Sequence, residues 1–271
     1  MKINGKILLK GLGLHSGKEC ELLIEPYDCD EVIMRSGDNE LPLSKFAWNG
    51  TNRGSDYIFP DGSMIKTCEH VLSALTGLGV WSGARVTVKG GEMPALDGCG
   101  KMLSDELMKI IRNEELGIRN YAEISSPVMV SSEDRKRFVA AFPADELHIT
   151  YAVEYDFIGS QIFDYTHTPE SYLADIASAR TFAMESDINY LRSHGMALGG
   201  SLDNAIVVGE KIQAKGGLRW KDEFVRHKVL DLIGDLASLG RPLKAHIVAV
   251  RAGHELHLKL AQRLRQNLKG E

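Results

Sequence analysis

The sequence has few cysteines, no excess of positive charge and no long apolar run. Its four cysteines, Cys20, Cys29, Cys68 and Cys99, form no Cys-x-x-Cys pair and are too few for a disulfide framework in 271 residues. We therefore expect reduced thiols. The formal net charge of -5 and the pI near 6.0 argue against a nucleic-acid-binding protein, because such proteins usually carry a basic surface.

No apolar run approaches the roughly 18 residues that a membrane-spanning helix needs. The first six residues are not followed by the apolar stretch of a signal peptide either. The sequence thus predicts a soluble cytoplasmic protein without a transmembrane segment. Its length allows one large domain or two modest ones, each with its own core.

Strand and helix patterns occur in two successive series, separated by a connector at 114–120 where the composition shifts. We expect two similar α+β domains, residues 1–118 and 121–271, each with strands and two helices. The predicted helices cover 64–78, 101–112, 169–177, 185–194, a segment around His227, and 255–268. The predicted strands include two within 2–24 joined by a glycine-rich loop, then 84–89, a series through 121–157, 204–208 and 246–250.

The segment from Arg226 to Asp235 places His227, Asp231 and Asp235 at four-residue intervals on a predicted helix. Side chains at i and i+4 share one helix face. An imidazole and a carboxylate stacked in this way can occupy two positions on one divalent metal, and this mixed nitrogen and oxygen set suits Zn²⁺. Three protein ligands with an open fourth position make a hydrolytic site, and we expect the third ligand from the helix that carries His70.

A simpler interpretation competes with the metal. Pairs of the type His-x-x-x-Asp often arise by chance, and Arg226 or Lys228 could neutralise the carboxylates instead. The helix is nevertheless apolar over much of its circumference, so its carboxylates are expected to be buried and to need partners. The apolar stripe is formed by Val225, Val229, Leu232 and Leu236.

Glu69 directly precedes His70 and is placed to act as a general base without binding the metal itself. Its alternative is an ordinary solvated carboxylate. His254 follows a predicted strand and could stabilise an oxyanion or protonate a leaving amine. The local sequence gives the remaining histidines no functional role, so we expect them to be structural or merely exposed. They include His15, His148, His167, His194 and His246.

The glycines of the segment Leu198 to Asn204 favour a competing hypothesis. Glycine-rich loops can bind phosphate through backbone N–H groups, so a kinase or nucleotide-binding module is an alternative. The segment lacks the G-x-x-x-x-G-K-[ST] pattern, and glycines after a helix more often end it. A third alternative is a non-catalytic, zinc-stabilised lipid or nucleotide carrier.

Seven motifs extend over nearly the whole chain. They are Gly-Leu-Gly-Leu-His-Ser-Gly at 11–17, Thr-Cys-Glu-His-Val-Leu-Ser-Ala-Leu at 67–75, Met-Pro-Ala-Leu-Asp-Gly at 93–98, Ala-Arg-Thr-Phe at 179–182, Leu-Gly-Gly-Ser-Leu-Asp-Asn at 198–204, Glu-Phe-Val-Arg-His-Lys-Val-Leu-Asp-Leu-Ile-Gly-Asp at 223–235 and Ala-Gly-His at 252–254. In this order and spacing they closely resemble the bacterial UDP-3-O-acyl-N-acetylglucosamine deacetylases, zinc amidases that commit sugar nucleotides to lipid A synthesis. The resemblance implies two α+β domains whose helices pack face to face between two sheets.

The resemblance also implies the metal site and the reaction. Zinc, or Fe²⁺ in vivo, would be bound by His70, His227 and Asp231, with Glu69 as general base. The substrate would be UDP-3-O-(3-hydroxyacyl)-N-acetylglucosamine, and the products the free amine and acetate. A monomer with transient contact to the inner membrane is the expected form.

The other residues of the expected site follow from the same resemblance. His254, paired with Asp235, would be the charged imidazole that protonates the departing amine, and Thr181 would help to hold the oxyanion. The remaining substrate contacts would be Lys228, Asp97 and Phe157, the last against uracil. An apolar channel for the acyl chain is expected between 182 and 207, with Phe182, Ile188, Ala197, Leu202 and Val207 as lining residues. Burial there would contribute about 0.8 kcal/mol per methylene.

One departure from the family pattern lies beside His254. Glu255-Leu256-His257 stands where the family commonly has a small residue, Leu and Asn. Glu255 could raise the pKa of His254 through its opposite charge, or it could point to solvent. The other site residues match, so we expect an active enzyme.

Overall fold

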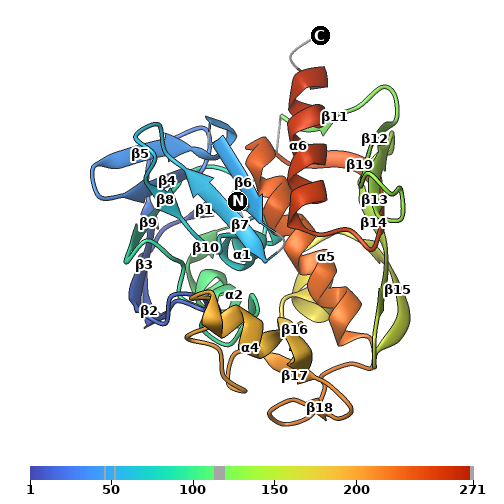
Figure 1. Cartoon of the computed structure of the whole chain (residues 1–271). Helices are drawn as coiled ribbons and strands as arrows, with labels where there is room; N and C mark the ends of the chain where they lie inside the picture. Colours follow the sequence, from blue (N-terminus) through green and yellow to red (C-terminus); the bar gives the residue numbers. More distant parts are fainter. Residues whose placement is uncertain (46, 52, 113–119, 269–271) are drawn as a thin grey trace.

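The computed structural model describes residues 1–45, 47–51, 53–112 and 120–268. Two large sheets, one from each half of the chain, lie on opposite sides of the molecule, and helices fill the space between them (Figure 1). The predicted α+β class is therefore confirmed. Among the described residues, no helix is both long enough and apolar enough to cross a membrane.

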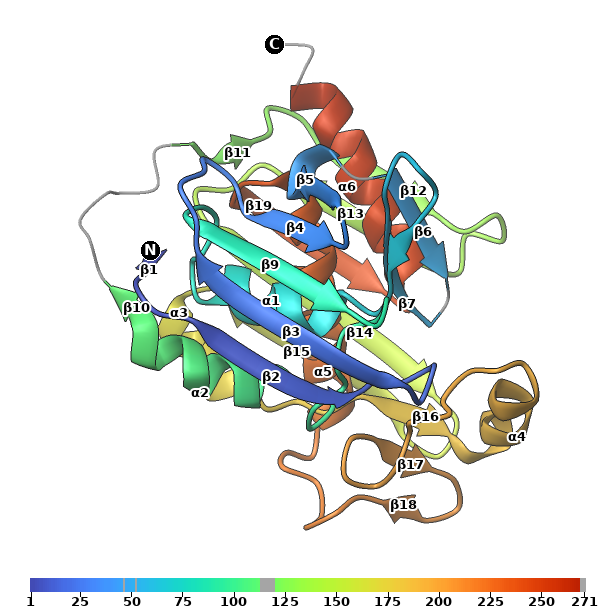
Figure 2. The same ribbon diagram turned by 90° about the vertical axis from the view of Figure 1, so that its left-hand side faces the viewer.

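The sheet of the first half has five strands in the order β2-β3-β9-β4-β5, and Figure 2 shows it in front of the helices. Neighbouring strands are antiparallel except for the parallel pair β4 and β9. Alternate residues of β3 and β9 are buried, so one face covers the helices. The strands are β2 Ile7–Leu12, β3 Glu19–Pro26, β4 Ile33–Ser36, β5 Asn39–Pro42 and β9 Ala84–Lys89.

The sheet of the second half repeats this arrangement. Its order is β12-β13-β19-β14-β15, with β11 Ala122–Glu123 added beside β19, and its parallel pair within the main order is β14 and β19. In both halves the last strand lies between the second and the third, which supports a duplicated unit. The strands are β12 Val128–Ser131, β13 Phe138–Phe142, β14 Leu147–Tyr155, β15 Gly159–Thr166 and β19 Leu243–Val250.

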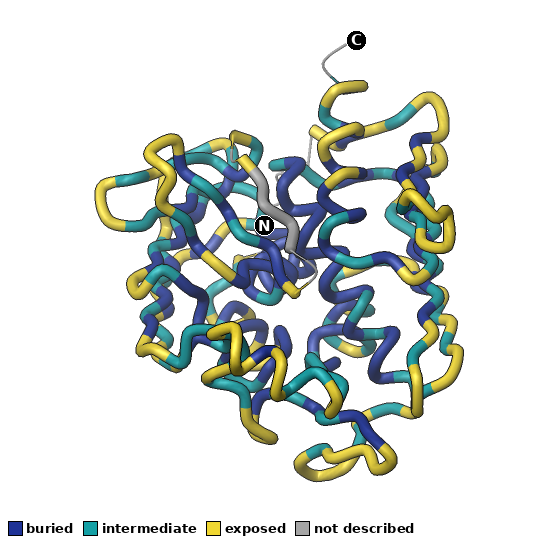
Figure 3. The backbone as a smooth tube through the Cα atoms, in the orientation of Figure 1, coloured by how far each residue is buried: buried dark blue, intermediate teal, exposed yellow. Residues whose placement is uncertain are grey.

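The long helices lie between the two sheets, where buried residues concentrate (Figure 3). Helices α1 Glu69–Gly77 and α2 Lys101–Ile110 belong to the first half, and α5 Glu223–Leu236 and α6 His254–Leu268 belong to the second. A Cβ on Gly234 of α5 would lie 2.0 Å from the carbonyl oxygen of Glu69. Glycine at this position therefore lets the backbones of α1 and α5 pack directly together.

Short elements complete the fold and support the loops around the helices. Two small sheets are formed by β6 Ala47–Thr51, β7 Gly54–Ile58 and β8 Met64–Ile65, and by β16 Phe182–Met184, β17 Ile206–Val208 and β18 Ile212–Gln213. Strand β1 Lys2–Ile3 pairs with β10 Ile111–Arg112. The remaining helical segments are η1 Leu43–Lys45, α3 Pro169–Ser171, the π-helical turn η2 Tyr172–Ile176, α4 Glu185–Ser193 and η3 Ala237–Leu239.

Most predicted elements are confirmed, with corrections at their ends. The helix predicted from residue 64 begins only at Glu69, because β8 pairs with β7 and because Thr67 has a φ of 56°, which a helix excludes. The helix predicted over 169–177 is instead the short α3 followed by the π-helical turn η2. The strand predicted from residue 204 starts at Ile206. Residues 114–119 of the predicted connector, 114–120, lie outside the described residues.

Candidate metal and catalytic site

Three side chains from two helices converge at the junction of the two halves. His70 lies in the first turn of α1, while His227 and Asp231 lie one turn apart on α5. Their ligand atoms all lie within 4.8 Å of one another. The predicted pairing of His70 with the α5 residues is thus a feature of the structure, and it depends on the close packing of α1 against α5.

The donor set fits a divalent cation. Oδ1 of Asp231 is buried and makes no hydrogen bond within the described part of the chain, although Nε2 of His227 lies 3.2 Å away and Nε2 of His70 lies 3.6 Å away. Nδ1 of His227 lies 3.0 Å from the carbonyl oxygen of Ala179, which fixes the ring and directs Nε2 toward the aspartate. A metal ion bound to the two imidazole nitrogens would also give this carboxylate oxygen the partner that a buried polar atom needs.

The protonation states of these groups suit metal binding as well. Burial lowers the pKa of His227 to about 3, so its imidazole is neutral at pH 7. Burial opposes the charge of Asp231, but the positive charges of Lys228 and His254 outweigh it and hold the pKa of this carboxyl well below its usual range. A neutral imidazole beside an ionised carboxylate is the state in which both can bind a metal.

Lys228 and Arg226, the two cations that could neutralise these carboxylates, contact different partners. Nζ of Lys228 donates to Oδ2 of Asp231 at 2.8 Å, which leaves Oδ1 available. Arg226 instead pairs with Asp222 at 2.9 Å and Asp175 at 3.0 Å. Lys228 therefore shares Asp231 with the two histidines and does not replace a metal.

Glu69 is buried at the start of α1, and its Oε2 accepts a hydrogen bond from the backbone N–H of Ser55 at 2.9 Å. Burial raises the pKa of this carboxyl, while the charges of His254 and His70 counteract the rise. It is not the solvated carboxylate of the simpler interpretation. A buried carboxylate beside a metal site is suited to accept a proton.

His254 begins α6, and its Nδ1 lies 2.9 Å from Oδ2 of Asp235, which is the pairing that the family resemblance predicted. Burial alone would lower the pKa of this imidazole, but Asp235 and Asp231 raise it to about 9. His254 is therefore protonated at neutral pH. Glu255 points away from this pair and forms an ion pair with Lys259 at 2.6 Å, so the solvent-facing alternative for Glu255 is the one found.

Three positioning residues of this network were missed from the sequence. The hydroxyl of Ser55 donates to Oδ1 of Asp235, and Nδ1 of His257 lies 2.7 Å from Oδ2 of the same carboxylate. Nε2 of His257 lies 2.9 Å from the hydroxyl of Tyr151. Only the departure at residue 257 gave a signal, because Ser55 and Tyr151 lie in unremarkable strand sequence.

We expect His257→Ala to lower the free energy of unfolding by about 3 kcal/mol, because it opens a cavity and removes a buried donor from Asp235. Thermal unfolding measures this change. His257→Asn, which retains an amide donor, should cost clearly less. Equal destabilisation by both variants would contradict the role of the Nδ1–H group in holding Asp235.

The site residues line a cleft of about 930 Å³. Thr181 and Phe182 line both this cleft and an adjoining one of about 1100 Å³. The backbone of Thr181 is held in place because its N–H donates to Gly98 and its carbonyl accepts from Ile206, each at 2.8 Å. The second cleft contains the other predicted channel residues, Ile188, Ala197, Leu202 and Val207.

Two predicted substrate contacts lie outside both clefts. Phe157 is 64% exposed in the turn between β14 and β15, with a φ of 64°. Asp97 lies 3.9 Å from Arg219 and accepts a hydrogen bond from Cys99, while its Oδ1 is buried and has no hydrogen-bond partner among the described residues. The structure therefore does not join these two residues to the metal ligands.

The glycine-rich segment that suggested a phosphate-binding loop has another use. The N–H of Gly199 donates to the carbonyl of Leu14, and the N–H of Gly200 donates to Ala197. A Cβ on Gly199 would lie 2.3 Å from the carbonyl oxygen of Gly13. These glycines therefore allow two loops to pack together, and their amides are already bonded, which argues against the kinase alternative.

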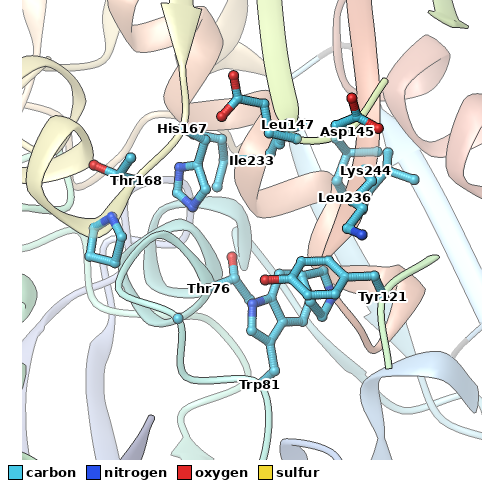
Figure 4. Close-up of a pocket in the computed structure, with 15 residues that line it drawn as sticks. Thr76, Trp81, Tyr121, Asp145, Leu147, His167, Thr168, Ile233, Leu236 and Lys244 are labelled. Atoms are coloured by element: carbon cyan, nitrogen blue, oxygen red, sulfur yellow. The ribbon is translucent and has the colours of Figure 1, made fainter. Parts of the chain in front are cut away.

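A third cleft, of about 990 Å³, lies at the other ends of α1 and α5 (Figure 4). Thr76 and Leu236, which lie at or near the C-terminal ends of these helices, line it together with Trp81, Tyr121 and His167. No residue of the metal site contributes to this cleft. The third cleft is thus separate from the candidate site.

A His₂Asp set beside a buried carboxylate, open to a cleft, is typical of metal-dependent hydrolases. The chain belongs to the UDP-3-O-acyl N-acetylglycosamine deacetylase family, whose model matches residues 1–266. The family resemblance predicted from the motifs is therefore confirmed.

Three relatives, each named UDP-3-O-acyl-N-acetylglucosamine deacetylase, illustrate the match. The protein of Syntrophus aciditrophicus is 35% identical over 263 residues, covering 94% of this chain and 82% of the relative. The protein of Aquifex aeolicus is 36% identical over 271 residues, covering 98% of this chain and 93% of the relative. The protein of a Nostoc species is 36% identical over 265 residues, covering 94% of each.

Proposed function

We propose that this protein is a zinc-dependent deacetylase that hydrolyses UDP-3-O-(3-hydroxyacyl)-N-acetylglucosamine to the corresponding glucosamine and acetate, the committed step of lipid A biosynthesis. The observation that carries the proposal is Oδ1 of Asp231, which lies between the imidazoles of His70 and His227 and has no hydrogen-bond partner among the described residues, in a chain of this deacetylase family. Zinc suits two imidazoles and a carboxylate, and Fe²⁺ is the alternative metal.

Zinc, when bound by these three residues, supplies Lewis-acid chemistry to water and to the acetamide carbonyl. Glu69 removes a proton from the attacking water, and the hydroxyl of Thr181 helps to hold the negative charge that develops on the carbonyl oxygen. The carbon–nitrogen bond of the amide then breaks. His254 donates a proton to the departing nitrogen, so the products are acetate and a free amine.

The electrostatic setting of His254 supports its role as the acid. Its pKa of about 9 means that the proton is present at pH 7, and Asp235 holds the ring through Nδ1. Nε2 therefore points into the site, 3.7 Å from Oδ2 of Asp231. Ser55 links the proposed base to the aspartate that holds the proposed acid. Its backbone N–H donates to Glu69, and its hydroxyl donates to Asp235.

The proposed substrate extends from the metal site in two directions. Lys228 lines the metal-site cleft and contacts the sugar nucleotide, while Asp97 and Phe157 are the further proposed contacts, Phe157 against uracil. The acyl chain occupies the adjoining cleft, where Phe182, Ile188, Ala197, Leu202 and Val207 provide an apolar lining. Each buried methylene contributes about 0.8 kcal/mol before ordering costs, so the size of this cleft sets the preferred acyl length.

The proposed enzyme consists of two domains, residues 1–118 and 121–271, and acts as a monomer. Residues on α1, α5 and α6 of one chain complete the site, so no second copy is needed for catalysis. Its four free cysteines support a location in the reducing cytoplasm. Contact with the inner membrane is transient and serves to exchange the acylated substrate and product.

Acetate release from UDP-3-O-(3-hydroxyacyl)-N-acetylglucosamine tests the proposal, with a series of acyl lengths and before and after chelation. Chelation should abolish release, and one equivalent of zinc per chain should restore it. His227→Ala should lose both the metal and the turnover. Unchanged zinc content and full turnover in His227→Ala would contradict the site, whereas no release from any acyl length by the zinc-loaded protein would contradict the substrate.

A further inference from the structure

A second cluster of side chains that could hold a metal lies on strands β14, β15 and β19 of the second sheet, which is at the right of Figure 1. Its members are His148 on β14, His246 on β19 and Asp164 on β15. Side chains alternate between the two faces of a strand. Because Ile149 and Ile247 are buried toward the helices, His148 and His246 point outward.

The strand register brings the two histidines together. His148 and His246 are directly paired on the parallel strands β14 and β19, and their rings stack with centroids 4.4 Å apart and planes 21° from parallel. On the other side of β14, Asp164 is directly opposite Thr150. The cluster therefore spans three neighbouring strands, which hold its geometry more firmly than loops would.

The polar atoms of the cluster lie within hydrogen-bond distance of one another in a continuous chain. Nε2 of His148 lies 2.8 Å from Oδ1 of Asp164, and the hydroxyl of Thr150 lies 2.6 Å from the same oxygen and 2.9 Å from Nε2 of His246. The hydrogen bonds from Thr150 and His148 hold the pKa of Asp164 below its usual value, so this carboxylate is ionised at neutral pH.

We propose that His148, His246 and Asp164 form a second divalent metal site, of the zinc class, that is separate from the site in the cleft. The ligands are Nε2 of both histidines and Oδ1 of Asp164, with the remaining positions open to water. Two imidazoles and one carboxylate are a common donor set for zinc. This inference does not rest on the proposed function, because none of its residues lines the metal-site cleft.

The distances require only a small adjustment to bind a metal. Tetrahedral zinc with bonds of about 2.0 Å keeps its ligand atoms about 3.3 Å apart. The three ligand atoms here lie within 4.8 Å of one another, and one pair is 2.8 Å apart. The side chains of His148 and Asp164 are 32% and 66% exposed, so rotation about their side-chain bonds can close the site and solvent can deliver the ion.

A purely hydrogen-bonded network is the alternative explanation, and zinc alone can distinguish the two. We expect wild-type protein dialysed against a fixed concentration of free zinc to hold two equivalents per chain. His246→Ala and Asp164→Asn should each hold one, because each removes a ligand from the sheet but leaves the buried site intact. Zinc per chain is measured by atomic absorption, with the unfolding temperature as a check that each variant is folded.

His194→Ala is the matched control, because His194 is an exposed histidine at the end of α4 that belongs to neither proposed metal site. It should retain both equivalents. A single equivalent in the wild type, equal zinc in wild type and His246→Ala, or the same loss in His194→Ala would each overturn the proposal. Deacetylation by His246→Ala should match the wild type, and a failure of the deacetylase assay in all proteins would leave this zinc count interpretable.

Discussion

Glu69→Gln should reduce the rate of deacetylation by about 10²- to 10⁴-fold and leave the zinc content unchanged, because it removes a general base but no metal ligand. The amide has almost the same shape as the carboxylate, and its oxygen can still accept the hydrogen bond that the backbone of Ser55 donates to Glu69. Acetate release at saturating substrate, together with zinc per chain, measures both effects.

Glu255→Gln is the matched control for this substitution. Glu255 is next to His254 in the sequence, but its side chain is 42% exposed and pairs with Lys259. We expect wild-type turnover from Glu255→Gln. A large loss there would mean that Glu255 does influence His254, and near-normal turnover in Glu69→Gln would exclude Glu69 as the base.

Gly234→Ala should cost about 3 kcal/mol of unfolding free energy, or roughly 10 °C in unfolding temperature, and should weaken zinc binding. The new Cβ would lie 2.0 Å from the carbonyl oxygen and 2.9 Å from the Cα of Glu69, which are backbone atoms that cannot rotate away. Helix α1 must therefore shift and carry Glu69 and His70 with it. Alanine's better helix propensity, worth about 1 kcal/mol, offsets only part of this cost.

Gly253→Ala adds the same methyl group beside His254, where a Cβ would meet no atom within 4 Å. We expect at most a small change in stability and an unchanged zinc content from this control. Thermal unfolding and zinc titration of the two variants isolate the effect of the distance between α1 and α5. A stable, zinc-loaded Gly234→Ala protein would show that the α1–α5 spacing is not needed to assemble the site.

The local parts of the candidate site could be predicted from the sequence because they depend on helix geometry alone. His227 and Asp231 share a face of α5 at a spacing of four residues, and the apolar stripe of that helix predicted its burial. The ends of some elements could not be predicted. The start of α1 at Glu69, for example, depends on the pairing of β8 with β7 and on the backbone of Thr67.

Local sequence patterns also pointed to His70, His254 and Asp235, and the family motifs added the pairing of His254 with Asp235. Neither revealed the residues that hold this pair. Ser55 bonds Asp235 across 180 positions of sequence, and Tyr151 meets His257 across 106. Neither contact has a spacing or a composition that a sequence pattern could reveal.

The sequence by itself determined the fold class, the position of the long helices and the chemistry of the candidate site, because periodicity and short-range spacing act within single elements. Only the tertiary structure decided which distant side chains meet. His148 and His246 carried no signal in the sequence, yet the parallel register of β14 and β19 stacks their rings. Strand pairing and helix approach are long-range contacts, and their partners are selected by the packing of the whole core rather than by neighbouring residues.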